Sequence, residues 1–462
     1  MASRGGFTNR LGFVAAAAGS AVGLGNIWKF PFEVGEGGGA AFVLMYLAFC
    51  FILCFPVMVT EIAIGRKTHK NPVGAFVALG HKKWKYLGML GIIAGVIILS
   101  FYNVVAGWAF GYFIEIVQGN FDIGKQFGSF VSNVVKIGGY GLLFMAATAF
   151  IVSRGVSGGI EKAAKILMPT LIIMMLGLVA YSFTLPNAIK GMEFYLLPDF
   201  SKINFSVVYS ALGQAFFSLS LGMGALITYG SYLDQKENII SSAALITLAD
   251  VGIAFLAGMM MFPFVFSQGL EPTGGPGLIF VTLPGIFQTL GPGLGVFIGG
   301  VFFLLLSFAA LTSTVSLLEV PVAYLVDEHK LSRKKAVLFT SIGIFLVGIP
   351  SLLANGASDF FSNFITYIGA EAPTDFMTFV GHLANDTFLP LGGLLIVSFA
   401  AFVWKKENLN KEIESGHPEF RGSWVEKYIN FAITILCPAI LGVIFIITVL
   451  NRFLGVDFAF LN

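Results

Sequence analysis

Long apolar segments run through this chain, and polar and basic residues separate them at intervals. A transmembrane helix needs about 20 predominantly apolar residues. A window of that length predicts eleven transmembrane helices, over residues 11–36, 40–65, 87–117, 138–153, 163–184, 205–233, 240–267, 294–326, 335–353, 386–404 and 428–450. The pattern therefore predicts an all-α polytopic membrane protein.

The first apolar segment contains a glycine-rich interruption. Gly19, Gly23 and Gly25 fall within seven positions, and Asn26 follows them. Unwound backbone at membrane depth is tolerated only where it is buried in protein or lines a cavity. Its free carbonyls and helix ends would then suit ions or a charged solute. A packing face of small residues is the alternative, and the first segment alone leaves both interpretations open.

A second interruption favours the interpretation as a binding site over that as a packing face. Residues 218–224, Ser-Leu-Ser-Leu-Gly-Met-Gly, break the sixth predicted helix as the glycines break the first. Paired breaks in corresponding helices of two halves indicate a transporter site near the membrane centre. Five helices between the breaks give the halves opposite orientations. We therefore predict an inverted 5+5 repeat of residues 11–184 and 205–404, with broken helices 1 and 6, and one extra helix at 428–450.

Charge and composition limit the class further. Only 11% of the residues are charged and 56% are apolar, against roughly 25% charged in a soluble domain. The net charge of +2 gives no indication of a nucleic-acid partner. Lys and Arg concentrate in residues 1–10, 66–85, 330–335 and 405–427, and such loops face the cytoplasm. This bias predicts that residues 1–10 are a cytoplasmic N-terminus and that the C-terminus lies outside.

The sequence gives little support to an intramembrane enzyme. All five histidines, His69, His81, His329, His382 and His417, fall in predicted loops. The predicted helices hold no Ser/His/Asp arrangement, phosphate-binding loop or metal-spaced cluster. We therefore expect neither haem ligation nor a histidine proton relay.

Three blocks of the sequence resemble the sodium:neurotransmitter symporter family. They run from Gly19 to Pro31, from Gln214 to Tyr232 and from Phe308 to Thr314. The rule of paired breaks was itself drawn in part from this family. The resemblance extends along essentially the whole chain, and eleven helices fit its bacterial members. It implies a sodium-coupled symporter that imports an amino acid by alternating access across a bacterial inner (plasma) membrane.

The resemblance implies two sodium sites, and sodium prefers oxygen ligands. The ligands implied for the first sodium are the Ala21 carbonyl and the side chains of Asn26, Ser218 and Asp250. The ligands implied for the second sodium are the carbonyls of Gly19, Val22 and Ala309 and the hydroxyls of Thr312 and Ser313. The alternative for these two hydroxyls is a bond back to carbonyls of their own helix.

Asp250 departs from the family pattern, in which most members carry Asn. A carboxylate in an apolar helix is costly and is a functional candidate by default. Animal relatives bind a chloride ion nearby, which supplies negative charge. The position at which an acidic residue could take over this role of chloride is occupied here by Ala254. We predict that Asp250 supplies the charge and that no chloride is needed. The alternative is that Asp250 lines a water-filled cavity without binding an ion.

The substrate is expected between the two breaks. Helix N-termini attract a carboxylate, and the family implies that Tyr102 also contacts it. Monoamine carriers have Asp at the position of Gly23, so Gly23 favours an amino acid. The predicted substrate-binding residues are Ala21, Gly23, Gly25, Ile98, Tyr102, Phe217, Ser218, Ser220, Met223, Ser313, Thr314 and Leu317. This largely apolar lining predicts a hydrophobic or aromatic L-amino acid.

Charged residues near the helix ends match the gates of the family. The outer pair is Lys29 and Asp386, and the inner gate is Arg4 with Asp327, Ser231 and Tyr232. Each charge could instead be an ordinary solvated residue at a helix end. Glu61, in the second predicted helix, is expected to cap the opened first helix.

Two other functions are considered. A proton-coupled amino acid permease of the same architecture is disfavoured, because such carriers replace the second sodium with a fixed positive charge, whereas Thr312 and Ser313 are both present. A non-transporting amino acid sensor would share the pocket but would not need two sodium sites. The sequence leaves the oligomeric state open.

Overall fold

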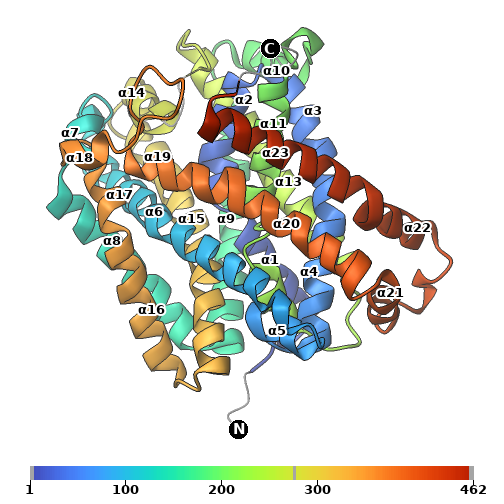
Figure 1. Ribbon diagram of the computed structural model, residues 1–462. Coiled ribbons are helices and arrows are strands. Elements are labelled where there is room, and N and C mark those ends of the chain that lie inside the picture. Colours follow the sequence, from blue (N-terminus) through green and yellow to red (C-terminus); the bar gives the residue numbers. More distant parts are fainter. Residues whose placement is uncertain (1–4, 274–276, 457–462) are drawn as a thin grey trace.

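A computed structural model describes residues 5–273 and 277–456 (Figure 1). The α-helices are α1 Arg10–Ala21, α2 Phe30–Glu36, α3 Ala40–Phe49, α4 Phe55–Thr68, α5 Pro72–Ala78, α6 Lys85–Val117, α7 Phe127–Val131, α8 Val134–Ser153, α9 Lys162–Ser182, α10 Ala188–Leu196, α11 Phe205–Ser218, α12 Ala225–Gly230, α13 Ile239–Ser267, α14 Leu283–Thr289, α15 Leu294–Glu328, α16 Arg333–Val347, α17 Ile349–Leu353, α18 Asp359–Ser362, α19 Phe376–Gly381, α20 Leu389–Ser398, α21 Lys406–Glu414, α22 Trp424–Phe431 and α23 Cys437–Leu454. Wider π-helical turns occupy Gly25–Lys29, Cys50–Cys54, Val156–Glu161, Leu278–Thr282, His382–Phe388, Phe399–Val403 and Ala432–Leu436. In these described ranges the pairing of extended chain is limited to one antiparallel bridge, between Ile365 and Thr374.

All eleven predicted transmembrane segments are helical. In the described residues nine helical segments are long and apolar enough to cross a membrane, and the pair of α1 and Gly25–Glu36, which meet at 47°, forms one more. The remaining predicted segment is 205–233, in which α11 and α12 flank the non-helical residues 219–224. The all-helical fold with two interrupted helices is therefore confirmed, while the division into two repeats stays a prediction.

The tenth predicted segment in chain order, 386–404, begins earlier than the sequence predicted, and its helical residues Phe376–Val403 are called the tenth segment below. Helix runs from Phe376 through Val403, so it starts ten residues before the predicted boundary at 386. Consequently His382 lies in a π-helical turn and not in a loop. The prediction was wrong because residues 376–385 mix polar and apolar side chains, which the hydropathy window excluded, although they pack on neighbouring helices.

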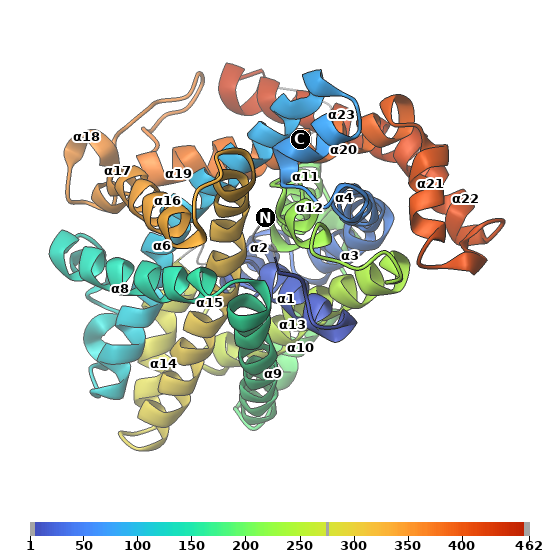
Figure 2. The ribbon, with the colours of Figure 1, turned by 90° about the horizontal axis from the view of Figure 1, so that it is seen from below.

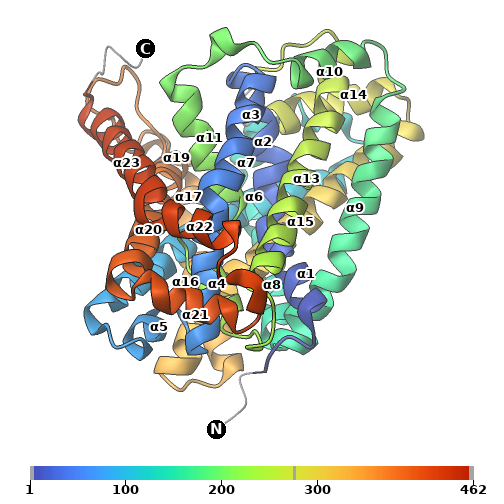
Figure 3. The ribbon, with the colours of Figure 1, turned by 90° about the vertical axis from the view of Figure 1, so that its right-hand side faces the viewer.

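The broken helices lie inside the bundle. Figure 2, seen from below, shows α1, α2, α11 and α12 in its interior, with α8, α9, α16 and α22 towards its edge. The two longest helices, α6 and α15, pack along each other beside these broken helices. In the side view of Figure 3 the first helix begins at one end of the bundle and α23 ends at the other, as an odd number of crossings requires.

The second break depends on left-handed backbone. Ser220, Gly222 and Gly224 have φ values of 55°, 79° and 75°, which a residue without a Cβ adopts most readily. At Gly222 an added Cβ would also lie 2.3 Å from the Leu389 carbonyl oxygen. The Gly222 N–H donates to Glu61 Oε1 at 2.8 Å. Glu61 therefore caps the second broken helix, whereas the sequence predicted that it caps the first.

The half-helix α12 is pressed against α4. A Cβ added to Gly65 would lie 2.1 Å from the Ile227 carbonyl oxygen and 2.9 Å from the Ser231 nitrogen. Glycine allows such close backbone approach between membrane helices. Because the obstructing atoms belong to the backbone, they cannot move aside as a side chain can.

Gly65→Ala should therefore destabilise the protein by about 1–3 kcal/mol through overpacking. Gly252→Ala is the matched control, because a Cβ at this helical glycine lies within 4 Å of no described atom beyond its own turn of helix and alanine favours helix. Thermal unfolding of both variants in detergent compares them. Equal melting temperatures for the two variants would contradict this close packing.

Candidate functional site

Asp250 lies at the centre of a buried polar cluster beside the first break. Its carboxylate accepts a hydrogen bond from Asn26 Nδ2 at 2.7 Å, and the Ser218 hydroxyl lies 2.9 Å from each carboxylate oxygen. All three side chains are buried. They come from the first helix, α11 and α13, so the fold brings together the side chains implied for the first sodium.

These groups suit a hard monovalent cation. A carboxylate, a hydroxyl, an amide and the carbonyls of an opened helix are all oxygen donors. Asn26 now directs its amide nitrogen at Asp250, while its Oδ1 accepts the Gly23 N–H at 3.0 Å. Its amide oxygen would have to turn to reach a cation. No cluster of three or more His, Cys, Asp or Glu side chains occurs in the part of the chain that the structure describes.

Tyr46 and Gln214 complete this cluster, and sequence reasoning missed both. The Tyr46 hydroxyl donates to Asp250 Oδ2 at 3.0 Å and lies 3.3 Å from Ser218 Oγ. Gln214 Nε2 donates to the Gly25 carbonyl at 2.7 Å. Each is a polar residue in a largely apolar helix, which is a weak signal in the sequence.

The residues implied for the second sodium also meet. The Thr312 hydroxyl lies 3.2 Å from the Val22 carbonyl oxygen and 2.9 Å from that of Ala309, and Ser313 Oγ lies 3.5 Å from the Val22 oxygen. A Cβ added to Gly19 would lie 3.4 Å from Thr312 Cβ. Thr312 thus reaches across to α1 and also makes the bond within its own helix that the alternative predicts.

A cavity of about 10 Å³ adjoins this second cluster, with Gly19 and Thr312 in its wall. A volume of this order holds a single water molecule. The space therefore matches one small ion or water beside the Thr312 hydroxyl.

A second small cavity of about 20 Å³ lies between the two breaks. It is lined by Ser20, Ala21, Gly23, Gly25, Ile98, Tyr102, Phe217, Ser220, Met223, Ser313 and Leu317. These include all the predicted substrate residues except Ser218, which faces Asp250, and Thr314. The Thr314 hydroxyl lies 2.8 Å from that of Thr148 on α8. Ser20 was not predicted, and its hydroxyl donates to Ser316 Oγ at 2.7 Å.

Backbone and side chains crowd around Gly23. A Cβ there would lie 2.2 Å from Ser313 Oγ and 2.7 Å from the Tyr102 hydroxyl. The Tyr102 hydroxyl also accepts the Leu24 N–H at 2.7 Å. An acidic side chain at position 23 would not fit this arrangement.

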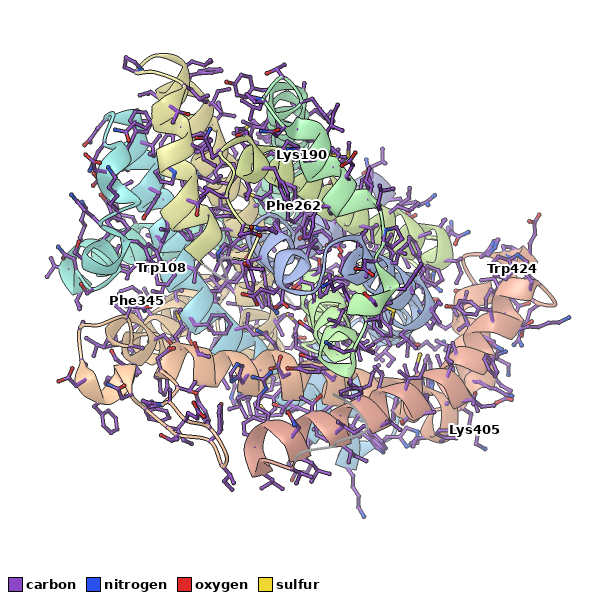
Figure 4. All side chains as sticks on the ribbon, turned by 90° about the horizontal axis from the view of Figure 1, so that it is seen from above. Trp108, Lys190, Phe262, Phe345, Lys405 and Trp424 are labelled. Carbon is purple, nitrogen blue, oxygen red and sulfur yellow. The ribbon has the colours of Figure 1, made fainter. Side chains whose placement is uncertain are left out.

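Phe217 separates the small cavity from a vestibule of about 410 Å³, because it lines both. The vestibule is lined in part by Trp28, Phe101 and Trp108, with the charged side chains of Lys29, Glu33, Asp386 and Arg452. Figure 4 views the bundle from above and labels Trp108 on α6, on the opposite side of the bundle from Trp424.

The vestibule charges pair differently from the prediction. Lys29 Nζ lies 3.7 Å from Glu33 Oε1 and 5.1 Å from the centre of the Phe217 ring. Asp386 Oδ2 instead lies 3.3 Å from Arg452 Nη2. The predicted Lys29–Asp386 pair is therefore not formed, because Glu33 lies one turn from Lys29 and Arg452 approaches Asp386 from α23.

Packed side chains close the opposite end of the bundle. The Tyr232 hydroxyl donates to Glu319 Oε1 at 2.6 Å, and Glu319 also pairs with Arg333. The Phe7 ring packs edge-on against Tyr232, with ring centres 6.2 Å apart. The remaining inner-gate residues are Asp327, which accepts hydrogen bonds from Asn71 at 3.0 Å, Ser231, whose hydroxyl donates to the Thr228 carbonyl, and Arg4, which lies outside the described residues.

Comparison with known proteins identifies the family. The sequence pattern of the sodium:neurotransmitter symporter family matches residues 4–131 and 125–455. The chain belongs to the sodium:neurotransmitter symporter family. An uncharacterised sodium-dependent transporter of Bacillus subtilis is 38% identical over 418 residues, 89% of this chain and 90% of that protein. Another, from Haemophilus influenzae, is 36% identical over 458 residues, 95% of this chain and 97% of that protein.

A solved structure shares the fold. The crystal structure of MhsT in complex with L-phenylalanine matches with a TM-score of 0.88 and 41% sequence identity, over 96% of this chain and 99% of that one. As a sodium:neurotransmitter symporter, this chain is a sodium-coupled secondary transporter of a membrane and not an enzyme.

The cluster implied for the second sodium can be tested directly. Thr312→Val with Ser313→Ala should abolish sodium binding there, because two oxygen donors are lost. A ligand that binds only the folded state raises its stability, so sodium should stabilise the wild type more than N-methylglucamine at equal ionic strength. The double variant should lose the share of this difference that comes from the second cluster and keep only the share that the Asp250 cluster contributes.

Thr340→Val with Ser341→Ala is the matched control. This Thr-Ser pair on α16 is also buried in an apolar helix, and its two hydroxyls have no hydrogen-bond partner among the described residues. An unchanged sodium response in the Thr312/Ser313 variant, equal to that of this control, would refute the assignment.

Proposed function

We propose that this symporter imports a hydrophobic or aromatic L-amino acid together with two sodium ions, by alternating access and without chloride. The observation that carries the proposal is the cavity between the two breaks, which combines apolar side chains with Gly25 and Phe217, the chain neighbours of Asn26 and Ser218 in the Asp250 cluster. MhsT, with a related fold, was crystallised with L-phenylalanine.

The cavity offers a different environment to each part of an amino acid. The broken first helix, with Tyr102 and Gly23, presents hydrogen-bonding groups and no fixed negative charge where the carboxylate would lie. Ile98, Met223 and Leu317 provide apolar walls for the side chain. Met223 is the most adaptable of these, since its unbranched side chain fills irregular spaces.

The small volume of the cavity gives Phe217 a role in binding. About 20 Å³ holds roughly one water, so the walls must separate to admit an amino acid. Phe217 packs near Tyr102, with ring centres 6.5 Å apart. Its movement would connect the cavity to the vestibule, and its return would exclude water around the bound substrate.

Sodium couples to the substrate through shared ligands. The first sodium would lie among Asp250, Ser218 and Asn26, next to the carboxylate position near Tyr102. A cation there replaces the mutual hydrogen bonds of these side chains, and the substrate carboxylate supplies a further oxygen. The second sodium would hold α1 to α15 through Thr312 and Ser313.

Asp250 removes the need for chloride. Its carboxylate is fully buried and receives hydrogen bonds from Asn26, Ser218 and Tyr46. Burial opposes the ionised form of this carboxylate and the hydrogen bonds favour it, and a sodium ion among these groups would favour it further, so that the carboxylate charge balances the cation. Ala254, one turn away, contributes no charged group.

The two ends of the bundle fit alternating access. The vestibule opens towards the end where α23 finishes, while Tyr232, Glu319 and Arg333 pack together at the other end. The basic loops 66–85 and 330–335 favour a cytoplasmic location for the closed end. The N-terminus would then be cytoplasmic and the vestibule external, in a bacterial plasma membrane.

Uptake should not depend on chloride. Wild-type uptake into proteoliposomes should persist when gluconate replaces chloride, because Asp250 provides the negative charge. Asp250→Asn should weaken sodium coupling. As a control, uptake by this variant is also measured with added chloride, to see whether chloride partly restores the coupling. Strict chloride dependence of the wild type would show that Asp250 does not have this role.

The substrate class is tested by removing the carboxylate. Radiolabelled tryptophan uptake should require sodium, and tryptamine should compete at least tenfold more weakly than tryptophan at saturating sodium. Each lost charge-assisted contact contributes about 1.5–3 kcal/mol, and 1.4 kcal/mol corresponds to tenfold in affinity. Equal potency of tryptophan and tryptamine would exclude recognition of the carboxylate.

A further inference from the structure

We propose that Arg452 of α23 is the cation of the external gate, that it must release Asp386 before the vestibule opens, and that protonation of His382 promotes this release. The proposal rests on the alternating access proposed above. It assigns to the last transmembrane helix a positioning residue that lies outside the two predicted repeats.

One guanidinium joins three helical segments at the vestibule. Arg452 Nη2 lies 3.3 Å from Asp386 Oδ2 and donates to the Tyr209 hydroxyl at 2.9 Å, while Nη1 lies 2.8 Å from His382 Nε2. Tyr209 belongs to α11, and His382 and Asp386 belong to the tenth segment. The planar guanidinium has five donors in a fixed arrangement, so it can make these contacts together.

Lys29 does not duplicate this function. Its ammonium lies near Glu33 and over the Phe217 ring, although it is close enough for its charge to act on Asp386. Removing Lys29 would leave the contacts of Arg452 with Asp386, His382 and Tyr209 intact. Removing Arg452 would instead free α11 from the tenth segment at this point.

The position of the cluster makes it a gate. Tyr209, His382, Asp386 and Arg452 all line the vestibule, and α11 is the first half of the second broken helix. Any widening of the vestibule that moves α11 away from the tenth segment must break the contacts of Arg452. Because Arg452 and Asp386 are only 22% and 17% exposed, solvent weakens their attraction less than at an open surface.

His382 adds sensitivity to protons. Arginine only donates hydrogen bonds, so Nε2 accepts from Arg452 and the closed gate needs a neutral His382. Its Nδ1 lies 3.2 Å from the Tyr367 hydroxyl. The other groups whose charges act on His382 are Lys29, Asp375 and Arg452, while Asp386 lies one turn along the same segment. A protonated His382 would repel the guanidinium and could pair with Asp386 once Arg452 has left.

Linkage sets the size and sign of this effect. Protons bind preferentially to the state in which Arg452 has left, so acid favours the open gate. If the released histidine has its ordinary pKa of about 6.5, lowering the pH from about 7.5 to 5 favours release by up to about 30-fold.

Cysteine labelling measures the gate directly. Val105 lines the vestibule and is only 1% exposed, so Val105→Cys should react with a membrane-impermeant thiosulfonate faster when the gate opens. The native Cys50, Cys54 and Cys437 are buried, and the protein without Val105→Cys gives their background. Labelling needs no transported substrate, so a wrong amino acid assignment would leave this test intact.

Arg452→Gln in this background should raise the labelling rate about tenfold, as expected for loss of a charge-assisted contact. Lys29→Gln is the matched control and should change the rate less than twofold. Arg452→Lys keeps the charge but loses the planar geometry, so its labelling rate should lie between those of Arg452→Gln and Lys29→Gln. If Arg452→Gln does not fold, Arg452→Lys serves as the test variant in its place. Equal rates for the Arg452 and Lys29 variants would overturn the proposal.

The pH profile separates gating from a structural role. Rates are divided by those of Val135→Cys, an 87% exposed reference position, because thiols react more slowly in acid. The corrected rate should rise from pH 7.5 to pH 5 in the parent and stay flat in His382→Gln and in Arg452→Gln. A rise that persists in either variant would refute the role of His382.

Discussion

The structure depends on satisfying the backbone that two broken helices expose inside the membrane. Each unpaired N–H or carbonyl costs several kcal/mol away from water, so every opened turn needs a partner. Tyr102 accepts the Leu24 N–H, Gln214 donates to the Gly25 carbonyl, and Glu61 accepts the Gly222 N–H. These partners come from other helices, and this requirement fixes how α4, α6 and α11 pack around the breaks.

The same constraint explains why the proposed transport site lies at the breaks. The groups that would bind sodium and substrate now bond one another, as Asn26, Ser218 and Asp250 do. Ligands can therefore exchange with internal hydrogen bonds without leaving buried groups unpaired. The site is therefore polar only where the charged groups of its ligands would lie. The remaining wall of the cavity is apolar and includes Ile98, Met223 and Leu317.

The two ends of the site are controlled by different chemistry. At the end near the N-terminal segment, aromatic packing of Phe7 accompanies the buried Tyr232–Glu319 contact. At the vestibule, Arg452 joins three segments through one charged group. Packed rings separate only when helices move, whereas a partly exposed ion pair also responds to protons and salt. The vestibule end is therefore the more sensitive to solution conditions.

The sequence by itself determined the helices, both interruptions and most groups of the site. These depend on local properties, namely apolar length, glycine content and isolated polar residues such as Asp250. The sequence did not determine the partners of long or charged side chains. Only the tertiary structure joined Arg452 to Asp386 and Glu61 to Gly222, because these contacts connect residues far apart in the chain, and the partner is whichever group the packing of the helices brings closest.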